Sequence, residues 1–103
     1  MDKKNRYLNV INTADKILND YEIDDIGKMS FISSILMNEF QEWIFCGFYR
    51  TVKKELLQIG PYQGKIVPCG HIAFNRGVCG ASATKRKTII VNDVSTFPGY
   101  ISC

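Results

Sequence analysis

The chain has 103 residues, 46% of them hydrophobic and 22% charged, and its net charge is +3. This composition is typical of one folded domain and excludes a disordered chain. No apolar run reaches the roughly 20 residues that a membrane-spanning helix needs. The basic start at residues 1–6 continues as an amphipathic pattern rather than as the apolar core of a signal peptide. We therefore expect one cytoplasmic domain over residues 1–103, with no membrane partner.

The charge is distributed unevenly along the chain. Residues 1–40 carry five Lys and Arg against seven Asp and Glu, whereas residues 41–103 carry eight against three. The densest basic segment, residues 85–87, is short, and a nucleic-acid surface usually shows a longer basic stripe with aromatic side chains between the charges. Cations also suit the C-terminal end of a helix. We therefore expect no nucleic-acid partner.

Two amphipathic helices are predicted at the start of the chain. Apolar residues recur at helical spacing over residues 7–21, and a second pattern of the same kind runs over residues 26–40. Between them lies an acidic link in which Asp24 or Asp25 can cap the second helix. Residues 1–40 are therefore expected to form an N-terminal helical part.

Strands are predicted after the helices. Residues 43–49 (WIFCGFY) are rich in aromatic and β-branched side chains, as buried strands are. The polar residues 50–55 predict a turn and residues 56–59 a hairpin partner, whereas residues 60–64 (GPYQG) have the composition of a loop. Cys46 is expected to pack inside the first strand, because free cysteine is among the most buried residue types.

The rest of the chain alternates short extended pieces with loops and one further helix. The predicted elements are extended segments at residues 66–69 and 72–74, a helix at 77–85 (GVCGASATK) and a strand at 88–91 (TIIV). Helices followed by strands predict an α+β domain, with the sheet and the cysteine-bearing loops within residues 41–103. The chain ends on a loop with a terminal cysteine, so we expect the domain to be incomplete at its C-terminus.

Three cysteines in the second half of the chain are candidates for redox chemistry. Cys79 lies near the start of a predicted helix, where backbone N–H groups and the helix dipole lower a thiol pKa, and Arg76 is placed to add positive charge. A thiolate attacks electrophilic sulfur, and a second cysteine resolves the product as a disulfide. Cys69 and Cys103 flank this helix on predicted loops. The spacing alone leaves both redox catalysis and purely structural cysteines open.

Metal binding is the competing chemistry in the same region. Cys69, His71, Cys79 and Cys103 supply a Cys₃His set of the kind that zinc accepts. Structural zinc sites usually take their ligands in close pairs, however, and only Cys69 and His71 are close in the sequence. A partly buried polar residue at a strand edge is the simplest interpretation of His71. We expect no metal ion and no other cofactor.

Six segments of the chain together point to a family. They are GFY at 47–49, LQIGPYQGK at 57–65, PCGHIAF at 68–74, RGVCG at 76–80, VNDV at 91–94 and FPGYISC at 97–103. With these segments and the spacing of its three cysteines, the chain resembles the free methionine-(R)-sulfoxide reductases, small cytoplasmic enzymes built on a GAF domain. The resemblance is close over residues 40–103 and looser over the two helices.

This resemblance implies a GAF-like α+β fold in which the N-terminal helices pack on an antiparallel sheet, with the final strands and the closing helix of the family missing. It implies thiol-dependent reduction of free L-methionine (R)-S-oxide to L-methionine. In such a reaction a thiolate attacks the sulfoxide sulfur, methionine leaves, and the sulfenic acid becomes an intramolecular disulfide that thioredoxin reduces. Free methionine sulfoxide and thioredoxin are the expected partners, and a homodimer is the expected assembly.

Roles for single residues also follow from the resemblance. It makes Cys103 the nucleophile and makes Cys69 and Cys79 the resolving or relay thiols, although the position of Cys79 at a helix start favours that thiol instead. Three aromatic side chains are candidates for apolar walls around the methionine side chain: Trp43, Phe48 and Tyr62. Core packing explains these aromatic residues equally well.

The chain also departs from the family pattern. After the last cysteine the family continues with an acidic segment that holds the carboxylates for the substrate ammonium group, whereas this sequence stops at Cys103. Tyr100, Ser102 and Ala73 stand where histidine, alanine and proline are usual. We therefore hypothesise a truncated reductase with an open pocket. The alternatives are a non-catalytic GAF module that binds a small ligand, an inactive fragment, and a zinc-stabilised interaction module.

Overall fold

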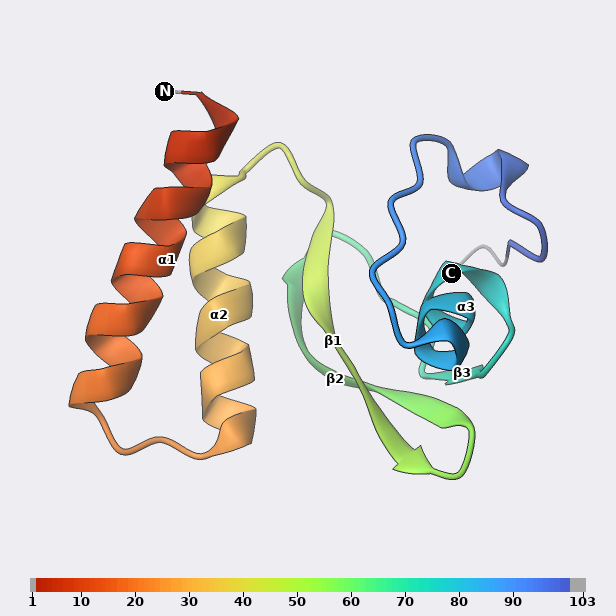
Figure 1. The fold of residues 1–103 in the computed structure, drawn as a ribbon. Coiled ribbons are helices and arrows are strands. Elements are labelled where there is room, and N and C mark those ends of the chain that lie inside the picture. The colour runs from red at the N-terminus through yellow and green to blue at the C-terminus, as the bar shows by residue number, and fades with distance from the viewer. Residues whose placement is uncertain (1, 101–103) are drawn as a thin grey trace. The chain divides into compact units, whose positions relative to one another are not determined.

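The computed structural model describes residues 2–100 and separates into two compact units. The first unit consists of Met1–Phe48 with Gly60–Ile66, and the second consists of Tyr49–Ile59 with Val67–Cys103. Figure 1 shows the described elements, which follow one another as α1, α2, β1, β2, β3, α3 and the short 3₁₀ helix η1. The strands β1 and β2 each contribute to both units.

Two helices make up most of the first unit. Helix α1 (Lys3–Asp20) and helix α2 (Asp25–Glu39) lie side by side in Figure 1 and pack on each other. Each is capped by an aspartate whose carboxylate accepts a backbone N–H from three residues later, at 2.8 Å for Asp2 and 2.9 Å for Asp24. The prediction of Asp24 as a cap is confirmed. Helix α1 starts earlier than its apolar pattern, because Asp2 supplies a cap before that pattern begins.

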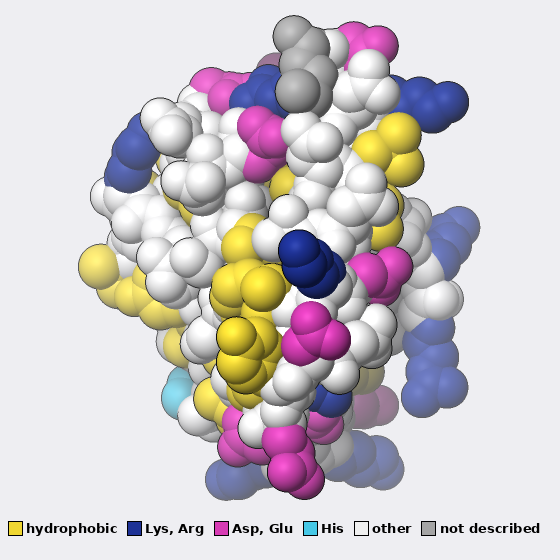
Figure 2. Space-filling model, turned by 90° about the vertical axis from the view of Figure 1, so that its left-hand side faces the viewer, with side chains coloured by type: hydrophobic (Ala, Val, Ile, Leu, Met, Phe, Trp, Pro, Cys, Tyr) yellow, Lys and Arg dark blue, Asp and Glu magenta, His cyan; other side chains and the backbone are white. Residues whose placement is uncertain are grey.

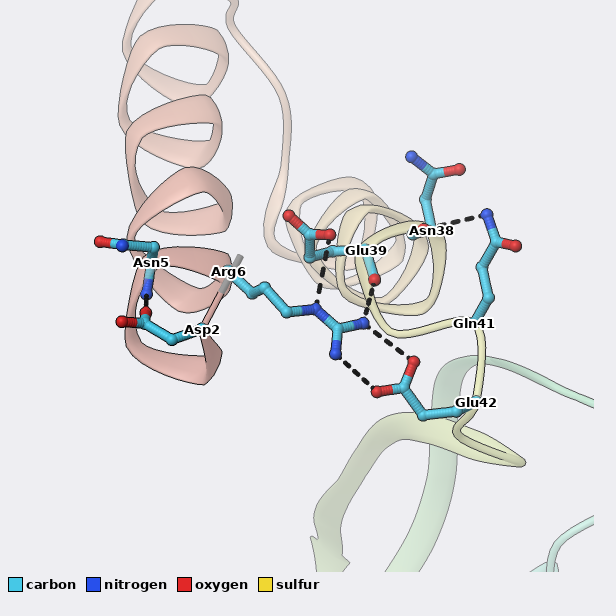
Figure 3. A network of polar contacts seen from close by, with 7 residues as sticks. All are labelled: Asp2, Asn5, Arg6, Asn38, Glu39, Gln41 and Glu42. Atoms are coloured by element: carbon cyan, nitrogen blue, oxygen red, sulfur yellow. Dashed lines mark hydrogen bonds and ion pairs between the residues drawn. The ribbon is translucent and has the colours of Figure 1, made fainter.

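A network of polar contacts joins the start of α1 to the end of α2 (Figure 3). The Arg6 guanidinium donates two hydrogen bonds to the Glu42 carboxylate, at 2.7 and 2.9 Å, and a third to the Glu39 carbonyl at 2.6 Å. The hydrogen bond from Arg6 is the main reason why the pKa of Glu42 falls to about 2. Arg6 also lies 4.3 Å above the Phe40 ring, a cation–π contact. Arg6 therefore connects both helices and the segment that follows them.

Phe40 is the centre of the core in the first unit. Its side chain is only 1% exposed, and its ring stacks on that of Trp43 with 4.3 Å between the centroids. The Tyr7 ring from α1 lies 4.7 Å from Phe40 on a tilted plane. Aromatic pairs of this kind contribute about 0.5–1.5 kcal/mol beyond the area they bury. The packing of Phe40 therefore fixes the chain where α2 ends.

The outer surface of α1 is mixed in character. Figure 2 shows the side of the molecule on which α1 lies, where hydrophobic side chains are interspersed with acidic and basic ones. On this helix Leu8 and Ile11 are 42% and 54% exposed, which is ordinary for single surface residues. No helix within residues 2–100 combines the length and the apolar character needed to cross a membrane.

The sheet begins with a hairpin whose strands are longer than predicted. Strand β1 (Phe45–Lys53) and strand β2 (Leu56–Gly64) are joined by a turn at Lys54 and Glu55. Glu55 adopts a left-handed φ of 55°, a backbone conformation common in tight turns. The predicted turn over residues 50–55 is therefore too long, because its first four residues continue β1.

The predicted loop at residues 60–64 is wrong, because these residues form the second half of β2. Proline is tolerated at position 61 since β3 pairs only with residues 56–58, so no described strand needs a backbone donor from Pro61 on that side. Gly47 on β1 faces Tyr62, and a Cβ at Gly47 would overlap the Cβ of Tyr62. Glycine and proline therefore mark a close strand pairing here rather than a loop.

The second unit contains the third strand and the third helix of the described residues. Strand β3 (His71–Ala73) pairs antiparallel with β2, and the sheet order is β1-β2-β3. Leu57 and Ile72, which are partners in this pairing, are both buried. Helix α3 (Gly77–Lys85) has the bounds that were predicted and packs on β3. The predicted α+β class with an antiparallel sheet is confirmed.

The predicted strand at residues 88–91 does not form, and this segment is coil. A β-strand needs a neighbour for its backbone N–H and C=O groups, and no described strand pairs with it. Ile90 is accordingly 87% exposed. The short helix η1 (Val94–Thr96) follows, and the Asp93 carboxylate caps it by accepting the Ser95 N–H at 3.0 Å.

Candidate functional site

Cys69 lies in the loop between β2 and β3 and is held there by two backbone carbonyls. The Cys69 carbonyl accepts a hydrogen bond from the Tyr49 hydroxyl at 2.7 Å. The carbonyl of Gly70 accepts one from the Ile59 backbone N–H at 2.9 Å. Cys69 itself is half-buried and disulfide-bonded. These bonds hold the end of the loop on the hairpin, whereas Val67, two residues earlier, is 82% exposed.

Cys79 is the third residue of α3, and the sequence brings this part of the helix close to β3. The adjacent Gly80 is buried, and a Cβ on it would lie 2.6 Å from the Ala73 carbonyl oxygen. A glycine at this position therefore allows the helix and the strand to approach each other. Gly77 begins the helix with a left-handed φ of 61°, a conformation that glycine adopts without strain. The start of α3, and Cys79 with it, is fixed against the end of β3.

Tyr49 and Cys79 are close enough to interact electrostatically. Burial, and then the charge of the Cys79 thiolate, raise the pKa of Tyr49 above its ordinary value. Burial also raises the pKa of the Cys79 thiol, although the residue as a whole is exposed. The expected lowering of the Cys79 pKa at this helix start is therefore wrong. Protein atoms around the sulfur disfavour its charged form.

The charge expected from Arg76 does not change this result. Arg76 is the N-cap residue of α3, and its side chain makes no capping hydrogen bond. Burial is the cause that sets the pKa of Cys79. At neutral pH Cys79 is therefore mainly a protonated thiol, and Tyr49 keeps the proton that it donates to the Cys69 carbonyl.

Tyr49, Cys69 and Cys79 thus form one group of residues in the second unit, which we call the Tyr49 cluster. Two of the three predicted cysteines interact with the Tyr49 phenol. Cys69 does so through its backbone carbonyl, and Cys79 does so through the charge of its thiolate. Disulfide chemistry requires that one sulfur reach another. In this structure Cys79 is a free thiol, whereas Cys69 is already disulfide-bonded, so the cluster holds one thiol and one disulfide sulfur.

The other predicted ligands and thiols are placed differently. Cys103 lies outside the described residues. His71 lies on β3 and is exposed, so its predicted partial burial is wrong. Within residues 2–100, no three His, Cys, Asp or Glu side chains come together in a way that could hold a metal ion. Cys46 is a half-buried free thiol on β1, and burial raises its pKa.

The three aromatic residues predicted as substrate walls all belong to the first unit. Trp43 stacks on Phe40, and the Tyr62 ring lies 5.6 Å from that of Phe45 on a nearly parallel plane. Phe48 is half-buried on β1. The contacts of Trp43 and Tyr62 account for them as packing residues of the first unit. Their role in substrate binding stays a prediction.

Two residues of the site were missed by sequence reasoning. Tyr49 lies in the predicted strand and in the GFY segment, and Gly80 lies in the predicted helix and in the RGVCG segment. Nothing in the chain between Tyr49 and Cys69 indicates that the two residues meet, since they are 20 positions apart. The signal for Gly80 was present, because a glycine inside a short helix often marks the close approach of another segment.

Comparison with known proteins gives the chain a family context, although no family model matches it. The free methionine-R-sulfoxide reductase of Saccharomyces cerevisiae is 36% identical over 92 residues, which cover 84% of this chain and 51% of that protein. GAF domain-containing protein A of Dictyostelium discoideum is 34% identical over 101 residues, which cover 98% of this chain and 62% of that protein. The crystal structure of free methionine-R-sulfoxide reductase from Neisseria meningitidis, in complex with its substrate, matches with a TM-score of 0.90 and 32% identity.

These matches extend over almost all of this chain but over only part of each relative. The Neisseria structure is matched over 100% of this chain and 60% of its own. The chain spans between 49% and 62% of the length of the curated relatives it matches. Agreement in both sequence and backbone confirms the GAF-like fold. The chain has the fold of the GAF domains, and its sequence is homologous to the free methionine-R-sulfoxide reductases.

Proposed function

We propose that the protein reduces free methionine-R-sulfoxide to methionine through its cysteine thiols. The observation that carries this proposal is the Tyr49 cluster, in which the loop of Cys69 and the helix start of Cys79 meet at one side chain. Homology to proteins named free methionine-R-sulfoxide reductase supports the choice of substrate. The chain spans about half of those proteins, so the activity is proposed for the intact protein.

The proposed reaction has two steps on the protein. A thiolate attacks the sulfoxide sulfur, methionine leaves, and the oxygen stays on the cysteine as a sulfenic acid. A second thiol then attacks the sulfenic sulfur, so that an S–S bond forms, the S–O bond breaks and water leaves. The two thiols thus supply the two electrons that reduce the sulfoxide.

The roles of the cysteines follow the family pattern and one observation. We assign the attack to Cys103 and the resolving steps to Cys69 and Cys79. The raised pKa of Cys79 supports this division, since a mainly protonated thiol is a poor first nucleophile. The disulfide-bonded state of Cys69 supports its part in the second step. The aromatic side chains of Trp43, Phe48 and Tyr62 are proposed to contact the methionine side chain.

Thioredoxin is the proposed reductant of the resulting disulfide. It would return the protein to the dithiol state by thiol–disulfide exchange, without a bound cofactor. This proposal rests on the family resemblance and on the predicted cytoplasmic location, where thioredoxin operates. A homodimer is the proposed assembly on the same ground.

The test begins with the fully reduced intact protein and stoichiometric free methionine-R-sulfoxide. Methionine release and the new disulfide are followed by mass spectrometry, and turnover is then measured with thioredoxin. The matched controls are the S epimer and a peptide that contains methionine-R-sulfoxide, neither of which should react. Release of methionine together with a disulfide among the three cysteines is the expected result.

Single cysteine variants assign the roles. Cys103→Ser should abolish methionine release, whereas Cys69→Ser and Cys79→Ser should permit one release and then impair turnover. Cys46→Ser is the control and should behave as the unaltered protein does. If free methionine-R-sulfoxide leaves the thiols of the unaltered protein and of every variant unchanged, the protein is not a reductase. Retention of sulfoxide binding without all three cysteines would then favour a ligand-binding GAF module.

A further inference from the structure

We propose that Tyr49 is a positioning residue for the disulfide step, because its hydroxyl holds the backbone of Cys69 in place beside the start of α3. The inference deepens the proposed function and rests on it. The step concerned is the attack of one thiol on a sulfenic sulfur, in which the S–S bond forms, the S–O bond breaks and water leaves. The contribution of Tyr49 is to the geometry of this step and not to its chemistry.

Hydrogen bonds hold the loop that carries Cys69. The hydrogen bond from Tyr49 to the Cys69 carbonyl is short, at 2.7 Å, and part-buried. The neighbouring Gly70 has no atom within 4 Å of the position of a Cβ, and Val67 is 82% exposed. Besides the disulfide of Cys69, the loop is held by the Tyr49 hydroxyl and by the bond from Ile59 to Gly70. When that disulfide is open, as it is before the second step, these two hydrogen bonds remain.

The Cys79 side of the Tyr49 cluster is held firmly. The backbone N–H of Asn75 donates to the Gly80 carbonyl at 3.1 Å and to the Thr84 hydroxyl at 3.0 Å. Gly80 also lies against the Ala73 carbonyl, where no Cβ would fit. The start of α3 is thus fixed on the end of β3. Of the two cysteine-bearing segments, the loop of Cys69 is the one that loss of a single hydroxyl would loosen.

Tyr49 interacts with both cysteine-bearing segments. It donates to the backbone of Cys69, and it interacts electrostatically with the Cys79 sulfur. Burial and the Cys79 charge keep its pKa above the ordinary value, so the hydroxyl remains a donor at neutral and mildly alkaline pH. Tyr49 can therefore hold the loop at neutral and mildly alkaline pH.

The test compares Tyr49→Phe with Tyr21→Phe in the intact protein. Both changes remove one phenolic hydroxyl and keep the ring, and Tyr21 is an exposed residue at the end of α1. In a single turnover with free methionine-R-sulfoxide, Y49F should release methionine at the normal rate but form its disulfide about two- to tenfold more slowly, as expected for one lost hydrogen bond. In steady state kcat should fall with KM unchanged. Y21F should match the unaltered protein in every measurement.

A second measurement tests the positioning role of Tyr49 independently of sulfoxide reduction. Equilibration with reduced and oxidised glutathione reports how readily the disulfide of Cys69 forms. This measurement needs no sulfoxide. The Cys69 disulfide of Y49F should be about two- to tenfold less stable against glutathione. If the unaltered protein releases no methionine, the proposed function fails, and the glutathione equilibrium still decides whether Tyr49 positions Cys69.

A rescue variant distinguishes loop positioning from a general loss of structure. Gly70→Ala fits the structure without contact and reduces the freedom of the unfolded and loosened loop. Added to Tyr49→Phe, it should restore part of the lost disulfide rate even if Y49F has a lowered Tm. Disulfide rates and glutathione equilibria equal to those of the unaltered protein would overturn the proposal. A raised KM with a normal disulfide rate would also overturn it and make Tyr49 a substrate contact.

Discussion

The two units of the molecule use their polar residues for opposite purposes. In the first unit the charged side chains of Arg6, Glu39 and Glu42 pair with one another around a buried phenylalanine. In the second unit the notable polar groups are thiols and a phenol, and burial raises the pKa of both Tyr49 and Cys79. The first unit carries eight Asp and Glu against six Lys and Arg, whereas the second carries two against seven.

This contrast shows which unit holds the structure and which holds the chemistry. The first unit is held by an ion pair with bidentate geometry and by stacked rings. In the second unit three residues that are not glycine, Glu55, Asn75 and Arg86, adopt left-handed φ values. Such residues are uncommon and tend to occur at turns and functional sites. Changes in the first unit should therefore act on stability, and changes in the second on thiol reactivity.

The largest effect on stability is expected from Phe40→Ala. The side chain is 1% exposed and contacts Arg6, Tyr7 and Trp43, so its removal leaves a cavity within three sets of contacts. We expect a loss of about 3–5 kcal/mol in the free energy of unfolding, measured by urea denaturation. Tyr21→Ala, at a 61% exposed position, is the control and should change it by less than about 0.5 kcal/mol. A loss below about 1 kcal/mol for Phe40→Ala would contradict the assignment of the core.

The next largest effect is expected from Gly80→Ala in the second unit. The new Cβ would lie 2.6 Å from the Ala73 carbonyl oxygen, so α3 must move away from β3. We expect a loss of about 1–3 kcal/mol in stability together with faster alkylation of Cys79, since the shift exposes its thiol. Gly70→Ala, which meets no atom within 4 Å, should not lower stability and should leave the alkylation of Cys79 unchanged. Normal Cys79 reactivity in a destabilised G80A protein would mean that the helix start does not set that reactivity.

A smaller effect is expected in the ionisation of Cys79. Because burial raises its pKa, the thiolate fraction at neutral pH is lower in the folded protein than in the unfolded chain. Alkylation by iodoacetamide in the reduced protein, followed by peptide mass spectrometry, should therefore be slower at pH 7 than in urea. The difference should shrink as the pH rises through the folded pKa. Faster labelling of Cys79 in the folded state would contradict this expectation. It would mean that Cys79 is an activated thiolate, as its position at the helix start suggests.

The smallest effect is expected from Glu42→Gln, and it depends on pH. The folded pKa of Glu42 is about 2, below its ordinary value, chiefly because Arg6 donates hydrogen bonds to the carboxylate. A lowered folded pKa contributes stability that is present above the unfolded pKa of about 4.3 and is lost as the pH falls towards 2. The unaltered protein should therefore exceed E42Q in urea midpoint at pH 6 and lose that advantage by pH 2. An advantage that is independent of pH would point to packing rather than charge. Because the pair is exposed, high salt should also reduce the difference.

The sequence by itself determined the features that depend on near neighbours. Helical periodicity predicts α1 and α2, an aspartate cap is predicted for α2, and the small residues of GVCGASATK predict α3 at its observed bounds. The α+β class follows from the order of these patterns. The cysteine spacing and the GFY, GPYQG and RGVCG segments indicate the family, since each segment is local and specific. These predictions are confirmed because the interactions behind them span only a few residues.

Only the tertiary structure decided the features that depend on distant partners. Residues 60–64 form a strand despite their glycine and proline because β1 lies opposite them, and residues 88–91 do not form one because no described strand pairs with them. The raised pKa of Cys79 depends on the protein atoms that surround its sulfur, which no local pattern reveals. Tyr49 joins the site through a carbonyl 20 residues away, and only folding brings the two together.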